Sequence, residues 1–169
     1  ALLGQCYASC IKQSGIEFDM LFGPAYKGIP LVAVTAAALA TEHGVNAPFA
    51  FNRKEAKNHG EGGNLVGAPV VGRVLLVDDV LTSGKAIRTA VDLIKAAEAE
   101  IAGVVIALDR AELGPSGETA VDILAADLGA PMISIAGVAD VISFLQGQTD
   151  RHDVLQSMRE YQQAYCKLA

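Results

Sequence analysis

The chain contains the run Val74-Leu75-Leu76-Val77-Asp78-Asp79-Val80-Leu81-Thr82-Ser83-Gly84-Lys85-Ala86, in which apolar residues lead to two adjacent acids and then to a small polar turn. The unbroken apolar part predicts a buried strand over residues 73–80. Apolar residues at helical spacing predict an amphipathic helix over residues 86–99. A strand, a tight turn and a helix in this order form the repeating unit of an α/β fold.

The same alternation continues along the chain on both sides of this unit. Short apolar runs bounded by turn residues predict further strands, at residues 20–25, 45–51, 103–108 and 132–136. Helical spacing, and a proline suited to a first turn at Pro30, predict helices at residues 1–8, 30–44, 118–128 and 150–169. This order specifies a parallel sheet flanked by helices, with ligands at the carboxyl ends of the strands. We expect one domain, residues 1–169.

The composition excludes several classes of protein. A formal charge of -6 argues against a general nucleic-acid surface, which needs a basic face. The longest apolar stretch, residues 29–40, is too short to span a bilayer, and the start shows no signal-peptide pattern. Cys6, Cys10 and Cys166 lack CxxC spacing, so neither a disulfide framework nor a zinc site is expected. We therefore expect a cytoplasmic protein without nucleic-acid or membrane partners.

Residues 52–72 show no helical or strand period and are polar, basic and rich in glycine. They predict a long flexible loop. Its hydrogen-bond donors include Arg53, Lys54, Lys57 and His59. Several donors on a segment with glycine hinges suit closure over an anionic leaving group. An ordinary solvated loop would explain the charges but not the paired glycines that follow His59.

The turn after the acidic pair has the chemistry of a phosphate site. Its backbone amides and the hydroxyls of Thr82 and Ser83 are expected to converge at a helix N-terminus, which suits a phosphate monoester. Asp78 and Asp79 would repel that phosphate unless they bind something else, such as two hydroxyls of a ribose. The sequence has neither the P-loop pattern nor GxGxxG at this helix. A helix cap alone would need only one acid and no run of hydroxyls.

Residues 74–86, the run from Val74 to Ala86, resemble the motif by which type I phosphoribosyltransferases bind phosphoribosyl pyrophosphate (PRPP). The resemblance implies the Rossmann-like fold of that family, and it implies that the acidic pair holds the ribose hydroxyls. The PRPP-binding residues that it implies here are Asp78, Asp79, Val80, Leu81, Thr82, Ser83, Gly84, Lys85 and Ala86. Lys85 departs from the small hydroxyl residue common in relatives, but its backbone amide remains available to a phosphate.

The predicted loop, residues 52–72, narrows the resemblance to one group within this family. Its sequence Asn52-Arg53-Lys54-Glu55-Ala56-Lys57-Asn58-His59-Gly60-Glu61-Gly62-Gly63-Asn64-Leu65-Val66-Gly67 is similar to the catalytic loop of bacterial orotate phosphoribosyltransferases. Residues 23–28 likewise resemble that family's pyrophosphate loop. The further PRPP contacts implied are Tyr26, Lys27, Arg53, Lys54, Lys57 and His59. The orotate contacts implied are Thr82 and Arg110, and the catalytic residues implied are Lys57, His59, Asp78 and Asp79.

The resemblance also implies a reaction and its partners. The phosphoribosyl group of PRPP would pass to orotate, giving orotidine 5'-monophosphate and pyrophosphate in de novo pyrimidine biosynthesis. The expected cofactor is magnesium, held mainly through PRPP, and the expected assembly is a homodimer with shared active sites. Two alternatives stay open: a phosphoribosyltransferase for another base, and a non-catalytic regulator that senses PRPP.

Relatives carry an N-terminal segment with a Phe-Thr-Leu-Lys-Ser-Gly-like stretch, which contributes PRPP and orotate contacts and part of the hood over the base. The sequence in hand has no such stretch, and it reads as a helix without a capping residue from Ala1 onward. It therefore predicts a type I phosphoribosyltransferase fold with an incomplete hood.

Overall fold

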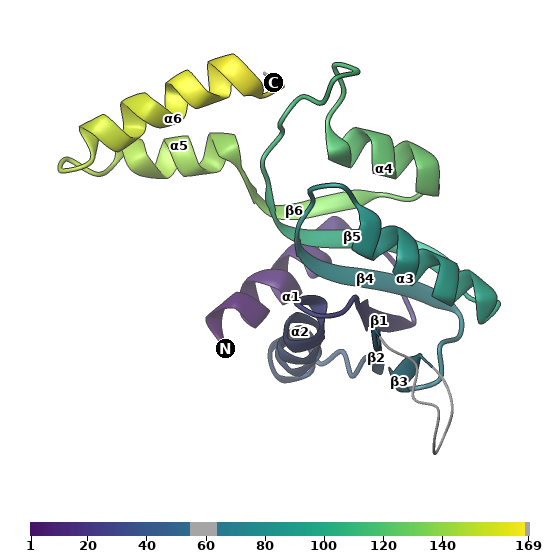
Figure 1. The fold of residues 1–169 in the computed structure, drawn as a ribbon. Coiled ribbons are helices and arrows are strands. Elements are labelled where there is room, and N and C mark those ends of the chain that lie inside the picture. Colours follow the sequence, from purple (N-terminus) through teal and green to yellow (C-terminus); the bar gives the residue numbers. More distant parts are fainter. Residues whose placement is uncertain (55–63, 168–169) are drawn as a thin grey trace.

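The structure is a computed structural model that describes residues 1–54 and 64–167. Its centre is a six-stranded sheet of order β3-β2-β1-β4-β5-β6 (Figure 1). β1 pairs in parallel with β2 and β4, and β5 pairs in parallel with β4 and β6. The predicted parallel α/β sheet is thereby confirmed. The strands are β1 (Met20–Gly23), β2 (Phe49–Asn52), β3 (Leu65–Gly67), β4 (Arg73–Val80), β5 (Glu100–Asp109) and β6 (Met132–Gly137).

β3 lies at one edge of the sheet and runs antiparallel to β2. It falls within residues 52–72, for which the sequence predicted a loop, so that prediction was wrong for Leu65–Gly67. Three residues are too few to show a strand period. The backbone amide of Arg53 donates to the carbonyl of Asn64 at 2.7 Å, which holds the two ends of the segment between them together. Residues 55–63 lie outside the described part of the chain.

Helices cover both faces of the sheet, because alternate residues of β4 enter two separate cores. Val74 and Leu76 pack with α3 and α4, whereas Leu75 and Val77 pack with α1 and α2. None of the helices within the described residues combines the length and apolar composition needed to cross a membrane. The helices are α1 (Leu2–Ser14), α2 (Gly28–His43), α3 (Lys85–Ala96), α4 (Ala120–Leu128), α5 (Val138–Gln146) and α6 (His152–Tyr165).

α5 and α6 form a hairpin that extends away from the sheet, and we call it the C-terminal arm (Figure 1). It has a small core of its own around Val138, Ile142 and Cys166. The main chain of Leu113 donates to the carbonyl of Tyr165 at 2.8 Å, so the end of α6 returns to the segment that follows β5. The sequence predicted a helical tail, but it did not predict α5.

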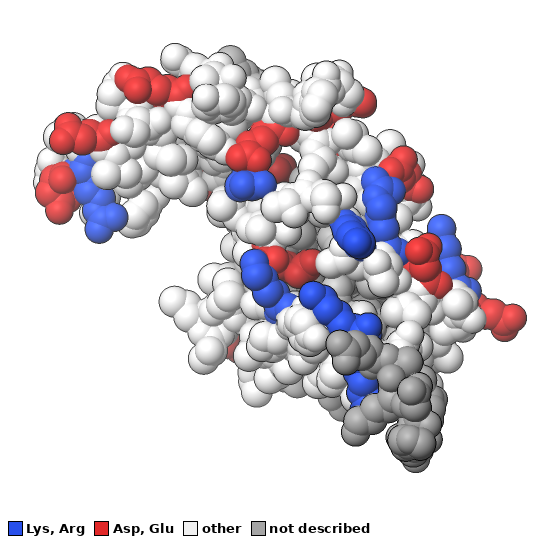
Figure 2. Space-filling view, in the orientation of Figure 1, with Lys and Arg blue, Asp and Glu red and all other residues white. Residues whose placement is uncertain are grey.

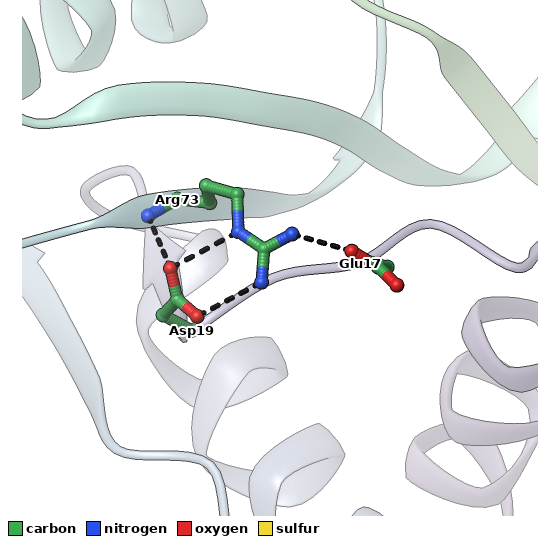
Figure 3. A network of polar contacts seen from close by, with 3 residues as sticks. All are labelled: Glu17, Asp19 and Arg73. Carbon is green, nitrogen blue, oxygen red and sulfur yellow. Dashed lines mark hydrogen bonds and ion pairs between the residues drawn. The ribbon is translucent and has the colours of Figure 1, made fainter.

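An ion-pair network ties the amino ends of β1 and β4 together (Figure 3). The guanidinium of Arg73 donates to both carboxylate oxygens of Asp19, at 3.2 and 3.1 Å, and to Glu17 at 2.7 Å. The hydrogen bond from the Arg73 side chain keeps the pKa of Asp19 below its usual value. These groups are largely exposed, so the network fixes geometry more than it adds stability. The network lies where β4 begins, whereas Asp78 and Asp79 lie near the carboxyl end of the same strand.

Candidate active site

The carboxyl ends of β1, β2, β4 and β5 meet at one edge of the sheet, because these four strands run in parallel. The segments that leave this edge are the ones in which the sequence predicted site residues. Figure 2 shows Lys and Arg side chains grouped on the face below the C-terminal arm, with acidic side chains between them. This edge is therefore the candidate site.

Asp78 is the buried member of the acidic pair, with 7% of its surface exposed. Burial, with the neighbouring charge of Asp79, raises the pKa of Asp78 to about 6. The backbone amide of Asp79 donates to the Asp78 carboxylate at 3.0 Å. Below it, the hydroxyl of the fully buried Tyr7 donates to the Asp78 carbonyl at 2.7 Å. Tyr7 thus fixes the main chain at the acidic pair, a role that the sequence did not reveal.

Asp79 is the more accessible member, and it pairs with Lys27 at 2.5 Å. Partial burial raises the pKa of Asp79, but hydrogen bonds from Lys27 and from the Val80 amide outweigh burial, so the net pKa is lowered. The same hydrogen bond raises the pKa of Lys27. Lys27 belongs to the segment after β1 and Asp79 to the end of β4. The structure therefore brings together two residues predicted separately to bind PRPP.

The turn after β4 opens α3 as the sequence predicted. Gly84 precedes the helix with φ of 67°, a left-handed conformation that favours glycine, and α3 begins at Lys85. The Ser83 hydroxyl accepts weakly from the Lys85 amide at 3.4 Å. The free amides and partial positive charge of a helix N-terminus stabilise anions. The turn and its hydroxyls thus have the chemistry of a phosphate cradle.

The segment between β1 and α2 is held by Asn52, which is 7% exposed at the end of β2. Its side-chain oxygen accepts from the Ala25 amide at 3.0 Å. Beside it, the ammonium of Lys54 lies 4.6 Å from the centre of the Tyr26 ring, a cation–π contact. The peptide between Ala25 and Tyr26 is cis. Asn52 therefore joins the two basic segments of the site, although it was not among the predicted site residues.

A first hollow of about 630 Å³ lies between these segments and the turn. Arg53 and Lys54 line one side, and Asp78 and the N-terminus of α3 line the other. Tyr26, Lys27 and Asp79 do not line it, although Ala25, Asp78 and Val80 next to Tyr26 and Asp79 do. Lys57 and His59 lie outside the described residues. The predicted PRPP-binding residues among its lining are Arg53, Lys54, Asp78, Val80, Leu81, Thr82, Ser83, Gly84, Lys85 and Ala86.

A second hollow, of about 310 Å³, lies on the other side of the turn, between α3, β5 and α4. Thr82 and Arg110, the two predicted orotate contacts, both line it. Residues 81–84 belong to both hollows, so the turn forms a shared wall. Arg110 comes from the end of β5, 28 positions after Thr82 in the chain. The fold therefore places the two predicted base contacts together.

Metal-binding groups at this edge are few. Over residues 1–54 and 64–167, no three His, Cys, Asp or Glu side chains come together in a way that would hold an ion. Asp78 and Asp79 supply two carboxylates. Mg²⁺ commonly binds through one or two carboxylates together with substrate phosphates rather than in an all-protein cage. The residues present fit an ion that arrives with a phosphate ligand.

Known proteins match this chain over most of its length. The family model for the phosphoribosyl transferase domain matches residues 2–127. An orotate phosphoribosyltransferase of Vibrio cholerae serotype O1 is 51% identical over 165 residues, which are 98% of this chain and 78% of that protein. One from Thioalkalivibrio sulfidiphilus is 54% identical with the same coverage.

A solved structure agrees with these relatives. The crystal structure of orotate phosphoribosyltransferase from Francisella tularensis superposes with a TM-score of 0.85 at 34% identity, and the match covers 98% of this chain and 79% of that one. Sequence and fold thus point to the same family as the geometry of the site. The chain belongs to the orotate phosphoribosyltransferase family.

Proposed function

We propose that the chain transfers the phosphoribosyl group of PRPP to orotate, giving orotidine 5'-monophosphate and pyrophosphate. The observation that carries this proposal is the pairing of two hollows across one turn. The larger joins an acidic pair, a helix N-terminus and basic side chains, and the smaller holds Thr82 and Arg110. A ribose phosphate in the first and an anionic base beside Arg110 would meet at this wall. The step belongs to pyrimidine biosynthesis in the cytoplasm.

The ribose and its 5-phosphate occupy the turn and the acidic pair. Asp78 and Asp79 accept from the ribose hydroxyls, and they stand at the end of a strand that buried side chains hold in place. The 5-phosphate accepts from the amides at the start of α3 and from the hydroxyls of Thr82 and Ser83. Lys85 contributes its amide here, and its side chain is exposed.

The pyrophosphate is received by the basic segments. Lys27, Arg53 and Lys54 come from the ends of β1 and β2, and Lys27 is held by Asp79 until an anion competes for it. Tyr26 supports the Lys54 ammonium through its ring. Lys57 and His59, which lie outside the described residues, belong to the same proposal as donors that neutralise the leaving group.

The reaction is a displacement at the anomeric carbon. The bond from that carbon to the pyrophosphate oxygen breaks, and a bond to a ring nitrogen of orotate forms, through an oxocarbenium-like state, while that nitrogen releases its proton. The acidic pair stabilises the positive ribose, and the basic segments stabilise the negative leaving group. This proposal needs no covalent nucleophile on the protein. The residues orient the partners and exclude water, which would otherwise hydrolyse PRPP.

Magnesium fits this arrangement as an ion held mainly by PRPP. Asp78 and Asp79 are the residues that would face it, directly or through water. When bound, the ion would supply neutralisation of charge on the pyrophosphate.

The family resemblance also supports a homodimer in which the segment between β2 and β3 serves the neighbouring subunit. The Arg53 to Asn64 hydrogen bond holds the base of that segment at the edge of the sheet.

The proposed function is tested by pyrophosphate release from PRPP and magnesium with each of several bases. Orotate should support turnover, whereas adenine, guanine and hypoxanthine should not. Release with a purine instead would point to another phosphoribosyltransferase. Binding of PRPP without release for any base would point to a regulator.

A further inference from the structure

Glu112 holds the side chain of Arg110 from two positions further along the chain. The guanidinium nitrogen Nη2 of Arg110 forms an ion pair with Oε2 of Glu112, at 2.9 Å. The other carboxylate oxygen, Oε1, accepts from the hydroxyl of Tyr161. Glu112 therefore stands between Arg110 and a tyrosine of α6 in the C-terminal arm. Neither Glu112 nor Tyr161 is among the residues predicted to touch a substrate.

The main chain around Glu112 is fixed by the same arm. The Leu113 amide donates to the Tyr165 carbonyl at 2.8 Å, and the Lys167 amide donates to the Ala111 carbonyl at 2.8 Å. The thiol of Cys166 donates to the Arg110 carbonyl at 3.3 Å. These contacts make a short antiparallel pairing between the segment after β5 and the end of α6. The arm thus sets both the backbone and the side chain of this segment.

Arg110 keeps part of its side chain open to a ligand, because 38% of that side chain is exposed beside Glu112. Its Nε has no hydrogen-bond partner within the described part of the chain, but it is buried, so a ligand would meet the exposed part of the side chain. Arg110 also lines the 310 Å³ hollow together with Thr82. A planar guanidinium binds carboxylates well only when its orientation is fixed.

We propose that Glu112 and Tyr161 are positioning residues that orient Arg110 toward the carboxylate of the base. The assignment of the base rests on the proposed function. Glu112 pairs with Nη2 of the guanidinium, Tyr161 holds Glu112, and Arg110 lines the hollow. The C-terminal arm is in this way part of base recognition, although its helices lie away from the PRPP hollow.

The first test is steady-state kinetics on the full-length protein with Glu112→Gln and Tyr161→Phe. Glu112→Gln keeps the volume but removes the charge, so the KM for orotate should rise about tenfold while the KM for PRPP stays within twofold. Tyr161→Phe should raise the KM for orotate about threefold. Because Tyr161 acts on Arg110 only through Glu112, the KM for orotate of the double variant should be no higher than that of Glu112→Gln alone.

Tyr165→Phe is the matched control, because Tyr165 is on the same helix and is 62% exposed. It should leave both KM values unchanged. An orotate KM that stays constant or falls in Glu112→Gln would overturn the proposal. Equal changes in both KM values together with a lowered melting temperature would also overturn it, since they would show a merely structural role.

The second test needs no turnover. Nitrogen-15 NMR of labelled arginine, with the Arg110 signal assigned through Arg110→Lys, should show restricted guanidinium rotation that Glu112→Gln releases. A signal unaffected by Glu112→Gln refutes the positioning role whatever the activity. A parent protein that leaves orotate unconsumed, while this signal still depends on Glu112, refutes the proposed function and leaves the contact between Glu112 and Arg110 established.

Discussion

Asp78 and Asp79 are neighbours in sequence, yet their carboxyls have different surroundings. Asp78 is buried and its pKa is raised to about 6, whereas Asp79 meets Lys27 and its pKa is lowered. The two acids therefore lose their protons in separate pH ranges, Asp79 first and Asp78 later. At neutral pH both are mostly ionised and able to accept hydrogen bonds from a ribose.

The raised pKa of Asp78 predicts a pH-dependent effect on stability. Its folded value of about 6 lies above the unfolded value near 3.8, so the folded state binds the proton more tightly. The cost of the buried charge is absent at low pH, grows as the pH rises from about 4 to 6, and is complete above that range. Asp78→Asn should therefore stabilise the fold at pH 8, by roughly 3 kcal/mol at most, and little at pH 4.

Urea unfolding at pH 4, 6 and 8 measures this difference. Asp92→Asn is the control, because Asp92 is an exposed acid on α3. A gain in Asp78→Asn that is the same at all three pH values would show that the buried charge is not its source.

The ribose-orienting role predicts that Asp78→Asn and Asp79→Asn each lose activity while the fold persists. Loss of a positioned acceptor in the transition state should lower the rate of orotidine monophosphate formation on the order of 10–100-fold. Far-UV circular dichroism checks that the fold is retained, and Asp92→Asn should keep full activity. Activity within a factor of two of the parent would remove the role from that aspartate.

The sequence predicted the acidic pair and its turn because those residues are contiguous. It did not predict the hydrogen bond from the Tyr7 hydroxyl to the Asp78 carbonyl, or the one from the Ala25 amide to Asn52. It also did not predict the ion pair between Arg110 and Glu112. Tyr7 and Asp78 are 71 positions apart, and Asn52 and Ala25 are 27 apart, so no local pattern could join them. Glu112 is local, but an acid near a strand end has many ordinary uses. Such partners emerge only from tertiary structure.

At the scale of elements, the strands were predicted from apolar runs that helices bury on both faces. β5 is longer than predicted because its first residues, Glu100 to Ala102, are polar or half exposed. α5 was missed, and only the tail helix of the C-terminal arm was expected. The arm, which the sequence predicted least well, supplies Tyr161.

The tight connection between β1 and α2 predicts that Gly23 tolerates no side chain. A Cβ at Gly23 would overlap the carbonyl oxygen of Gly28 and lie 2.7 Å from Cγ1 of Val32. Gly23→Ala should therefore push α2 from β1, lower stability by roughly 2 kcal/mol, and raise the KM for PRPP by moving Lys27.

Gly147→Ala is the matched control for that change. Gly147 ends α5 with φ of -80°, and a Cβ there would lie 3.5 Å from the Phe144 carbonyl oxygen, an ordinary contact. Thermal unfolding and PRPP kinetics compare the two variants. If Gly23→Ala and Gly147→Ala have the same melting temperature and the same KM for PRPP, the connection between β1 and α2 accommodates a side chain and the prediction is wrong.

At the scale of the whole molecule, the site draws on segments that the chain supplies far apart. The ends of β1, β2, β4 and β5 all contribute, and only the parallel topology brings them to one edge. The base of the segment between β2 and β3 lies at the outer edge of this sheet. Whether that segment serves its own hollow or a neighbour's is a question about the assembly rather than the fold.

Shared sites predict that two inactive variants restore activity when their subunits mix. A Lys57→Ala subunit has a defective loop and an intact acidic pair, and an Asp78→Asn/Asp79→Asn subunit has the opposite defects. Each variant alone should be nearly inactive. If the loop acts on the neighbour, every mixed dimer has one site with both good halves, so random exchange of equal amounts restores roughly a quarter of the parent sites. Subunit exchange is verified by native mass spectrometry, and orotidine monophosphate formation is measured before and after mixing. If the loop serves its own subunit, each site keeps one defective half and no activity returns, which would assign Lys57 to its own pocket.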